Sequence, residues 1–148
     1  MSDCVVGIDA EPDHGDMAQL VGGLTEYNAL HAAGDVPNYL LVSVRDATGR
    51  LGGGLLGATY LGWLSIQVMW LEEGLRGQGH GGALLALAEE EALRRGCPRV
   101  FVETLSFQAL PFYERHGYQV HSRLDDFPPG GVRYTPTKML GGAVRVSR

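Results

Sequence analysis

Residues 70–95 read WLEEGLRGQGHGGALLALAEEEALRR, and this stretch predicts a glycine-rich loop followed directly by a helix. Four glycines between Gly77 and Gly82 leave backbone N–H groups uncovered, and the alanine- and leucine-rich segment after them has helix-forming composition. The first N–H groups of a helix have no intrahelical partner, and the helix dipole adds positive charge at the same place. With Arg76 beside it, we interpret the loop as a cradle for a diphosphate group.

The spacing of these glycines leaves two kinds of phosphate-binding loop open. No Gly-Lys pair is present, so the P-loop of nucleoside triphosphatases is excluded. Gly77, Gly79 and Gly82 fit the G-x-G-x-x-G pattern of dinucleotide-binding proteins, and Glu103 ends the next strand, where a ribose-binding acid would stand. That fold needs several further βαβ units, which the antiparallel-looking segments after the next strand do not supply. The second kind is the pattern Arg76-x-x-Gly79-x-Gly81, which is considered below with a second motif.

Composition and charge favour a single globular domain and exclude some classes of partner. A chain of 148 residues is long enough for one core, so we expect residues 1–141 to form one domain and residues 142–148 a disordered tail. The formal net charge of −5 argues against nucleic acid or an anionic membrane and mildly favours a cationic acceptor such as an amine. The sequence shows no signal peptide, no long apolar run and only two cysteines, so we expect a cytoplasmic protein.

The hydrophobic pattern predicts an alternation of strands and helices that is typical of a mixed α/β fold. Gly22 and Gly23 predict a bend or break in the first helix, and the glycines between Gly52 and Gly57 predict a bulge or a close backbone approach. The expected elements, in chain order, are a strand at 4–8, a helix at 16–33, strands at 39–44, 51–61 and 64–71, the helix after the loop, a strand at 99–105, a helix at 109–116, and strands at 118–122 and 132–140.

A second motif follows the glycine loop at a distance that leaves room for one helix and one strand. Residues 106–118 read SFQALPFYERHGY and fit the pattern N-x-x-A-x-x-[FL]-Y-x-x-x-G-[FY], except that Ser106 stands in place of asparagine. Together with [QR]-x-x-G-x-[GA] at Arg76, this order of motifs resembles the GCN5-related N-acetyltransferases (GNAT). The resemblance covers residues 64–118 most clearly, and the loop at 125–130 is similar to a bacterial branch with varied acceptors. A serine can still form the asparagine's hydrogen bond but reaches less far.

The resemblance implies an α/β (α+β) fold with a mixed, mostly antiparallel sheet and helices on both faces. The two central parallel strands, 64–71 and 99–105, would splay apart at their C-terminal ends. Acetyl-CoA would lie with its pantetheine arm in that gap, along the backbone of the first strand, and with its diphosphate on the glycine loop. The implied cofactor-binding residues are Met69, Trp70, Leu71, Arg76, Gly77, Gln78, Gly79, His80, Gly81, Gly82, Ser106, Ala109 and Phe112.

The implied activity is direct acetyl transfer to a primary amine of a small molecule or peptide, through a ternary complex and without an acyl-enzyme. Tyr113 matches the family's general acid, and its alternative is a core aromatic beside Phe112. Glu103 is the candidate base, and its alternative is a surface carboxylate paired with an arginine. Candidate substrate contacts are Glu26, Tyr27, Gln67 and Asp126.

A rival interpretation keeps the same cofactor site without catalysis. A non-catalytic CoA or acyl-CoA sensor would need Arg76 and the glycine loop but would not depend on Tyr113. The resemblance is also compatible with a homodimer, for which no motif in the chain argues. The histidines have no ligand-like spacing with cysteines or carboxylates, so we expect no metal site.

Overall fold

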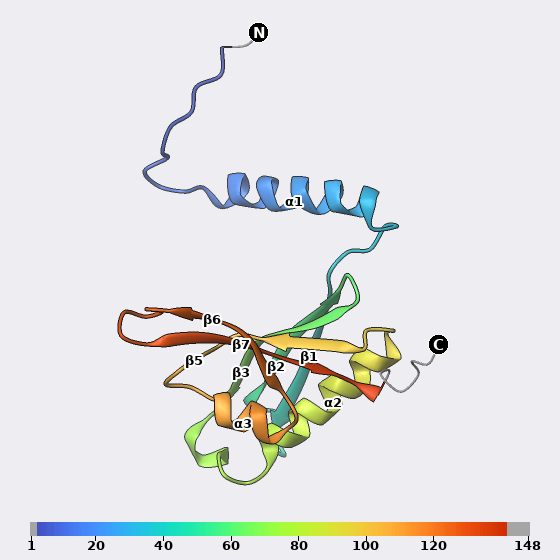
Figure 1. The fold of residues 1–148 in the computed structure, drawn as a ribbon. Helices are drawn as coiled ribbons and strands as arrows, with labels where there is room; N and C mark the ends of the chain where they lie inside the picture. The colour runs from blue at the N-terminus through green and yellow to red at the C-terminus, as the bar shows by residue number, and fades with distance from the viewer. Residues whose placement is uncertain (1–2, 142–148) are drawn as a thin grey trace. The chain divides into compact units, whose positions relative to one another are not determined.

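The structure is a computed structural model that describes residues 3–141. It divides the chain into two compact units, Met1–Val36 and Pro37–Arg148 (Figure 1). A single domain over residues 1–141 therefore stays a prediction, and the predicted tail at 142–148 lies outside the described residues. Among the described residues, no helix is both long and apolar enough to cross a membrane.

The first unit consists of an extended segment and helix α1 (His14–His31). Asp13 caps this helix, because its Oδ2 accepts a hydrogen bond from the N–H of Asp16 at 3.1 Å. The helix starts two residues earlier than predicted and runs without a break through Gly22 and Gly23. The prediction of a strand at residues 4–8 was wrong: this segment has no regular secondary structure.

The second unit contains a seven-stranded sheet with the strand order β1-β2-β3-β4-β7-β5, and β6 pairs with β7 outside this path. Among the described strands only β3 and β4 run parallel, and every other pair is antiparallel. The predicted mixed, mostly antiparallel sheet is thus confirmed. The strands are β1 (Asn38–Arg45), β2 (Leu51–Tyr60), β3 (Trp63–Leu71), β4 (Arg99–Val102), β5 (Thr104–Leu105), β6 (Gln119–Asp125) and β7 (Val132–Met139).

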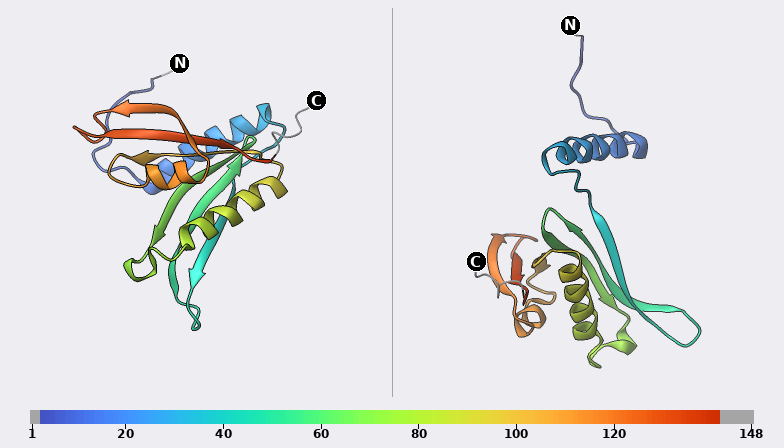
Figure 2. Two further views of the ribbon diagram at one scale, coloured as in Figure 1. Left: turned by 60° about the horizontal axis from the view of Figure 1, so that its bottom comes forward. Right: turned by 90° about the vertical axis from the view of Figure 1, so that its right-hand side faces the viewer.

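Helix α2 (His80–Arg94) and the short helix α3 (Leu110–Arg115) lie on the same face of this sheet. Helix α2 contacts β1, β2 and β3 and lies alongside these strands in Figure 2. A short 3₁₀ helix, η1 (Glu73–Leu75), precedes the glycine loop. The residues that α2 buries in the core have the spacing of one helix face: Leu84, Leu85, Ala88 and Ala92.

Polar contacts link α2 to β7 and Tyr118 through Glu89, and to β1 and β2 through Arg95. Glu89 accepts hydrogen bonds from the Tyr118 hydroxyl at 2.7 Å and from the Lys138 ammonium at 3.0 Å. Arg95, just after the helix, donates to the carbonyl of Asn38 at 2.8 Å and to the hydroxyl of Thr59 at 3.1 Å. The helix that follows the glycine loop is therefore fixed in place by polar contacts as well as by its apolar face.

Glycines in β2 allow the neighbouring backbones to approach closely, as predicted. A Cβ atom at Gly57 would lie 2.7 Å from the carbonyl oxygen of Ser65. The register between β2 and β3 shifts at the same place, between Leu56 and Gly57, so that Gln67 on β3 is an extra residue without a pairing partner. This β-bulge turns the second half of β3 relative to its first half.

We expect Gly57→Ala to destabilise the fold, because its Cβ would press on backbone that cannot move away cheaply. Overpacking of this kind costs about 1–3 kcal/mol of unfolding free energy. Gly74→Ala is the matched control: a Cβ there meets nothing within 4 Å. Urea unfolding followed by circular dichroism measures both, and equal stabilities for the two variants would contradict the close approach.

Candidate active site

The two parallel strands at the centre of the sheet separate after a short stretch of pairing. β3 pairs with β4 only from Trp63 opposite Arg99 to Ile66 opposite Val102. Beyond that point β3 continues to Leu71, whereas the chain after β4 turns away and pairs with β7 as β5. The predicted splayed strand pair is therefore present, with a gap on the C-terminal side of Ile66 and Val102.

A cleft of about 820 Å³ occupies this gap. Its walls come from the free half of β3, from the end of β4 with β5, and from the start of α3. Gln67, the bulged residue, stands at its edge. The residues that line the cleft are Ile66, Gln67, Val68, Met69, Trp70, Leu71, Arg76, Val102, Glu103, Thr104, Phe107, Gln108, Ala109 and Tyr113.

The segment Met69–Leu71 offers backbone hydrogen-bonding groups to the cleft. One edge of this segment pairs with β2, where Leu55 is opposite Met69 and Gly53 is opposite Leu71. No described strand pairs with its other edge, because the β4 partner has already ended. An open strand edge of this kind can bind an extended chain that carries amide groups.

The glycine loop forms a second hollow of about 430 Å³ next to the cleft. Gly77 and Gly79 have φ angles of 74° and 85°, which side chains disfavour, and Gly79 is the N-cap of α2. The N–H of Ala83 bonds back to the Gly79 carbonyl. The N–H groups of the preceding helical residues point out of the helix end. The lining residues are Leu71, Arg76, Gly77, Gly79, His80, Gly81, Gly82, Phe112, Arg115 and His116.

Small residues at the start of α2 let α3 pack directly against the loop. A Cβ on Gly81 would lie 3.2 Å from the Phe112 ring, and one on Gly82 would lie 3.0 Å from the His116 ring. His116 is itself fixed by a 2.9 Å hydrogen bond between its Nδ1 and the Phe112 carbonyl. The predicted cofactor residues His80 and Phe112 thus lie together in this hollow, and Gln78 stabilises the loop by donating to the Gly74 carbonyl at 2.9 Å.

Arg76 joins the two hollows. Its side chain lines both of them, and its Nε donates to the carbonyl oxygen of Leu71 at 2.9 Å. This bond ties the loop to the last residue of β3 and places a guanidinium charge between the cleft and the glycine amides. Arg115 adds a second positive charge to the loop hollow. An anion in the loop hollow would therefore meet two guanidinium groups and the end of a helix dipole.

Tyr113 is buried in α3 at the inner end of the cleft. Its ring packs edge-on against Phe112 and Tyr118, at centroid distances of 5.1 and 5.5 Å. Burial raises the pKa of the Tyr113 hydroxyl to about 12. This side chain is therefore a protonated hydrogen-bond donor throughout the physiological pH range.

Glu103 lies at the rim of the cleft, on the face of the sheet opposite α2. Its carboxylate forms an ion pair with Arg133 of β7, whose guanidinium also stacks over the Phe127 ring at 4.7 Å. The alternative interpretation from the sequence, a carboxylate paired with an arginine, describes this contact correctly. The same carboxylate still lines the cleft, so its candidacy as a base stays open to test.

The sequence predicts Ser106 as the polar residue of the turn between β5 and α3 that faces the cofactor, but the structure places other polar residues at the cleft. Ser106 does not line the cleft, and its Oγ accepts a hydrogen bond from the Val132 N–H at 3.1 Å. Thr104 and Gln108 do line it: Thr104 Oγ1 accepts from the Ala109 N–H at 3.2 Å, and Gln108 Oε1 accepts from the Leu105 N–H at 2.7 Å. Sequence reasoning missed both, although their positions beside Ser106 in a motif that lacks its asparagine could have suggested them.

The candidate substrate residues lie on three elements: β3, the loop between β6 and β7, and α1. Gln67 lines the cleft. Asp126 lies in the exposed loop between β6 and β7, where its Oδ1 accepts a hydrogen bond from the Gly130 N–H at 3.2 Å. Glu26 and Tyr27 belong to α1 in the other unit, where Tyr27 contacts the His31 ring. The structure therefore places only Gln67 at the cleft, and the other three stay predictions.

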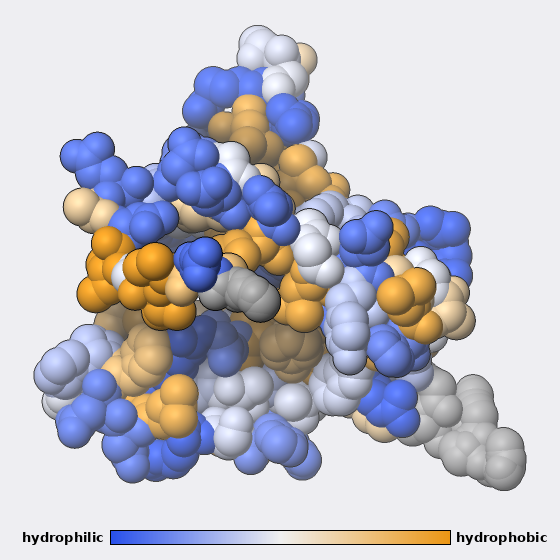
Figure 3. All heavy atoms as spheres, turned by 90° about the horizontal axis from the view of Figure 1, so that it is seen from above, coloured by the Kyte–Doolittle hydropathy of each residue, from blue (hydrophilic) through white to orange (hydrophobic). Residues whose placement is uncertain are grey.

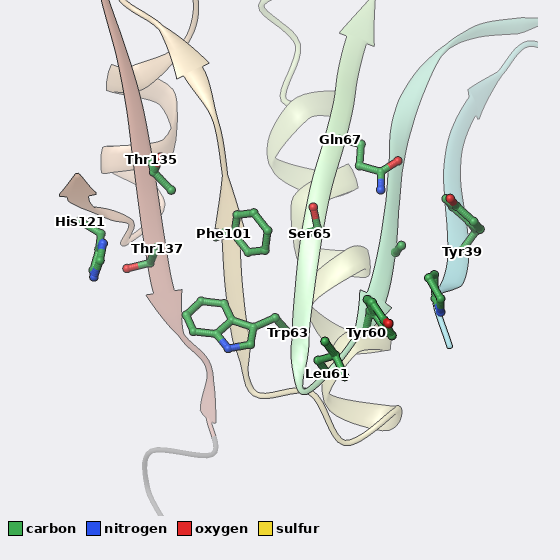
Figure 4. Close-up of a pocket in the computed structure, with 12 residues that line it drawn as sticks. Tyr39, Tyr60, Leu61, Trp63, Ser65, Gln67, Phe101, His121, Thr135 and Thr137 are labelled. Atoms are coloured by element: carbon green, nitrogen blue, oxygen red, sulfur yellow. The ribbon is translucent and has the colours of Figure 1, made fainter. Parts of the chain in front are cut away.

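A third hollow of about 610 Å³ lies on the sheet face opposite α2 and borders the cleft at Gln67 (Figure 4). We call it the aromatic hollow. Trp63 and Phe101 form an edge-to-face pair in it, with ring centroids 5.8 Å apart. The lining residues are Pro37, Tyr39, Ala58, Tyr60, Leu61, Trp63, Ser65, Gln67, Phe101, His121, Thr135 and Thr137. Within residues 3–141, no group of histidine, cysteine and acidic side chains could hold a metal ion.

Comparison with known proteins connects this arrangement to one family. The family model described as "Acetyltransferase (GNAT) family" matches residues 14–118. The chain is 39% identical over 95 residues to the acetyltransferase Atu2258 of Agrobacterium fabrum, covering 64% of this chain and 69% of that one. It is 43% identical over 93 residues to blasticidin-S acetyltransferase of Streptomyces morookaense, covering 62% and 68%.

A crystal structure described as an Agrobacterium tumefaciens acetyltransferase has the same fold. It superposes with a TM-score of 0.81 and is 30% identical, and the match covers 95% of this chain and 100% of that one.

The pKa of Tyr113 predicts a late component in a spectrophotometric titration. An ordinary tyrosine ionises near pH 10. Tyr113→Phe should therefore remove absorbance change at 295 nm near pH 12 and leave the change near pH 10 intact. Because the pKa is higher in the folded state, the stability linked to Tyr113 is complete below about pH 10 and falls as the pH rises to about 12. Loss of amplitude near pH 10 instead would show that Tyr113 is exposed.

Proposed function

The chain belongs to the acetyltransferase (GNAT) family, and on that premise we propose that it transfers an acetyl group from acetyl-CoA directly to a primary amine. The observation that carries this proposal is the continuity of two features: an open edge of β3 in the cleft, and a glycine-lined anion site, joined by Arg76. The first suits the amide groups of a pantetheine arm. The second suits a diphosphate. Because the two sites adjoin at Arg76, one molecule that carries both a pantetheine arm and a diphosphate can occupy both.

The residues present fit acetyl-CoA, which supplies the activated acetyl group. The open edge at Met69–Leu71 can exchange backbone hydrogen bonds with pantetheine amides, as an added strand would. The loop amides and the guanidinium groups of Arg76 and Arg115 can hold the diphosphate. A backbone N–H near Leu71 would stabilise negative charge that develops on the acetyl carbonyl oxygen.

The lining of the cleft favours direct transfer over an acyl-enzyme. It contains no cysteine, serine, lysine or histidine. Its one aliphatic hydroxyl, on Thr104, is engaged with the Ala109 N–H. With no activated nucleophile available, the acceptor amine itself attacks, and the protein contributes by holding the two substrates together in a ternary complex.

Tyr113 and Glu103 are the proposed proton-transfer groups. The Tyr113 hydroxyl has no hydrogen-bond partner among the described residues, stays protonated, and lines the cleft, so it can donate to the leaving sulfur. Glu103, at the opposite rim, would take the proton that the attacking amine loses, directly or through a water molecule. Its ion pair with Arg133 holds the carboxylate at the rim.

For the acceptor we propose a small-molecule amine ahead of a peptide. The relative that shares 43% identity is named for acetylation of the small molecule blasticidin S. The cleft also adjoins the aromatic hollow rather than an extended surface groove. We further propose that the protein acts in the cytoplasm. A sensor without catalysis would share the cofactor site, and the variants below separate the two functions.

Cofactor binding is tested by thermal unfolding with CoA, acetyl-CoA and NADH in separate titrations. We expect a concentration-dependent rise in Tm with the two CoA species only, because a ligand of the folded state stabilises it by mass action. Arg76→Ala should weaken CoA binding about 10- to 100-fold, the usual effect of one charge-assisted hydrogen bond. Arg94→Ala, outside both hollows, is the control. Stabilisation by NADH alone would identify a dinucleotide-binding protein instead.

Catalysis is tested by thiol release with a panel of small amines. Tyr113→Phe should lower kcat about 100-fold or more while the Kd for CoA changes less than about threefold, because only the proton donor is removed. Tyr134→Phe, in β7 and outside the lining of the cleft, should leave kcat near that of the wild type. Activity that survives Tyr113→Phe unchanged would remove the proposed acid. Absence of thiol release with every amine, despite CoA binding, would support the sensor.

A further inference from the structure

Gln108 carries hydrogen-bonding groups in the wall of the cleft that the proposed mechanism does not use. Its side chain lines the cleft at the turn between β5 and α3. Such groups indicate a ligand more specifically than hydropathy does, since hydrophilic and hydrophobic side chains are mixed over the face of the molecule in Figure 3. One end of the Gln108 amide is committed to the turn, whereas the other end is not.

The oxygen end of this amide is fixed by its neighbours. The backbone N–H of Leu105 donates to Gln108 Oε1 at 2.7 Å, and the backbone N–H of Gln108 donates to the Leu105 carbonyl at 2.8 Å. Thr104 Oγ1 lies 3.5 Å from the same Oε1 and is itself held by the Ala109 N–H. Because a backbone N–H can only donate, the amide atom that it meets is the oxygen, and the NH₂ group lies at the other end.

The Leu105 N–H that Gln108 binds lies on the edge of β5 that points away from β7. The next N–H along the chain, that of Ser106, donates to the Val132 carbonyl at 2.8 Å. Successive residues of an antiparallel strand direct their N–H groups to opposite edges, so Leu105 directs its own away from β7. Gln108 therefore covers the cleft side of β5, and the open edge of Met69–Leu71 belongs to the other wall.

The nitrogen end of the Gln108 amide is an unused donor. Within residues 37–141, its NH₂ group forms no hydrogen bond. The bonds accepted by Oε1 polarise the amide, which makes the NH₂ group a stronger donor. They also fix its position before any ligand arrives, so little side-chain entropy is lost on binding. The wall opposite β3 thus offers a fixed donor that suits a carbonyl oxygen.

Ser106 does not offer such a group, although it occupies the asparagine position of the second motif. Its N–H donates to the Val132 carbonyl, and its Oγ accepts from the Val132 N–H at 3.1 Å. Both contacts turn this residue toward β7, and it does not line the cleft. The amide side chain at this wall of the cleft is that of Gln108.

We propose that Gln108 binds the pantetheine arm of CoA by donating a hydrogen bond from Nε2 to one of the arm's amide carbonyl oxygens. This assignment rests on the proposed function, because it requires the arm to lie along Met69–Leu71. The backbone of β3 then binds one side of the arm and Gln108 binds the other. A ligand that has the diphosphate but no pantetheine arm gains nothing from Gln108.

Gln108→Glu removes the donor and keeps the turn, because a carboxylate oxygen can still accept from the Leu105 N–H. Isothermal titration calorimetry should give a Kd for CoA about 5- to 50-fold higher than that of the wild type, since a donor is lost and an oxygen faces the carbonyl instead. The Kd for 3′-phospho-ADP, the nucleotide half of CoA, should change less than about twofold. Gln119→Glu, in β6 and outside the cleft and the loop hollow, controls for the added charge.

The outcomes of this titration separate the assignment from the proposed function. Equal losses of affinity for CoA and 3′-phospho-ADP in Gln108→Glu would overturn the contact with the arm. So would a Gln108→Glu protein that binds CoA as the wild type does while Gln108→Leu does not, because Gln108 would then serve only the turn. In both cases the proposed function stands. A wild type that binds CoA no more tightly than 3′-phospho-ADP would overturn the proposed function and the assignment together.

A second measurement uses the wild-type chain and does not depend on how the variants fold. The side-chain NH₂ resonances of Gln108, assigned by triple-resonance NMR, should shift when CoA is added and stay in place when 3′-phospho-ADP is added. Backbone resonances of Met69–Leu71 report the arm on the other wall in the same spectra. If these shift with CoA while the Gln108 NH₂ resonances do not, the arm lies along β3 without touching Gln108, and the proposal is overturned.

Discussion

The arrangement of the site depends on the early end of the parallel pairing between β3 and β4. Pairing stops after Ile66 and Val102 because Gln67 is bulged on one strand and the chain after the other turns toward β7. The bulge in turn requires the glycines of β2, since a Cβ at Gly57 would collide with the backbone of β3. A continuous β3–β4 ladder would close the cleft and use up the hydrogen-bonding groups of Met69–Leu71. The catalytic proposal therefore rests on backbone that the sheet leaves unpaired.

The functional groups along this cleft come from two helices, α2 and α3, which pack against each other. The first turn of α2 presents the loop amides, while α3 presents Tyr113, and the contact of Gly81 and Gly82 with Phe112 and His116 sets the distance between the two. Arg76 completes the frame by bonding the last carbonyl of β3. An anion site and a proton donor are thus held at fixed positions along one cleft. A long, flexible cosubstrate such as acetyl-CoA has to be held at both its diphosphate and its reacting end, and fixed sites along one cleft do this.

The sequence predicts features that depend on neighbouring residues in the chain, and it misses features that depend on strand pairing and on hydrogen bonds between distant residues. The glycine loop, α2 and the second motif are recognisable because each follows from residue types at fixed spacing, and the resemblance that the two motifs carry predicts the central parallel pair of strands. The split of the segment 99–105 into β4 and β5 could not be read, because it depends on pairing with β7. The motif position points to Ser106 as a cofactor residue, yet its hydroxyl oxygen accepts a hydrogen bond from the Val132 N–H, and Thr104 and Gln108 order the turn. Residues 4–8 have the composition of a strand, yet this segment has no regular secondary structure.

The central claim is that the open edge of β3 and the glycine loop bind one molecule of acetyl-CoA. Amide hydrogen exchange, followed by mass spectrometry with and without CoA, tests it at the residues concerned. The account predicts slower exchange at Met69–Leu71 and at the loop amides from Gly77 to Gly82, with little change in β6 and β7. Protection confined to the loop would contradict binding along β3. Protection in the aromatic hollow with none at either segment would contradict the account as a whole.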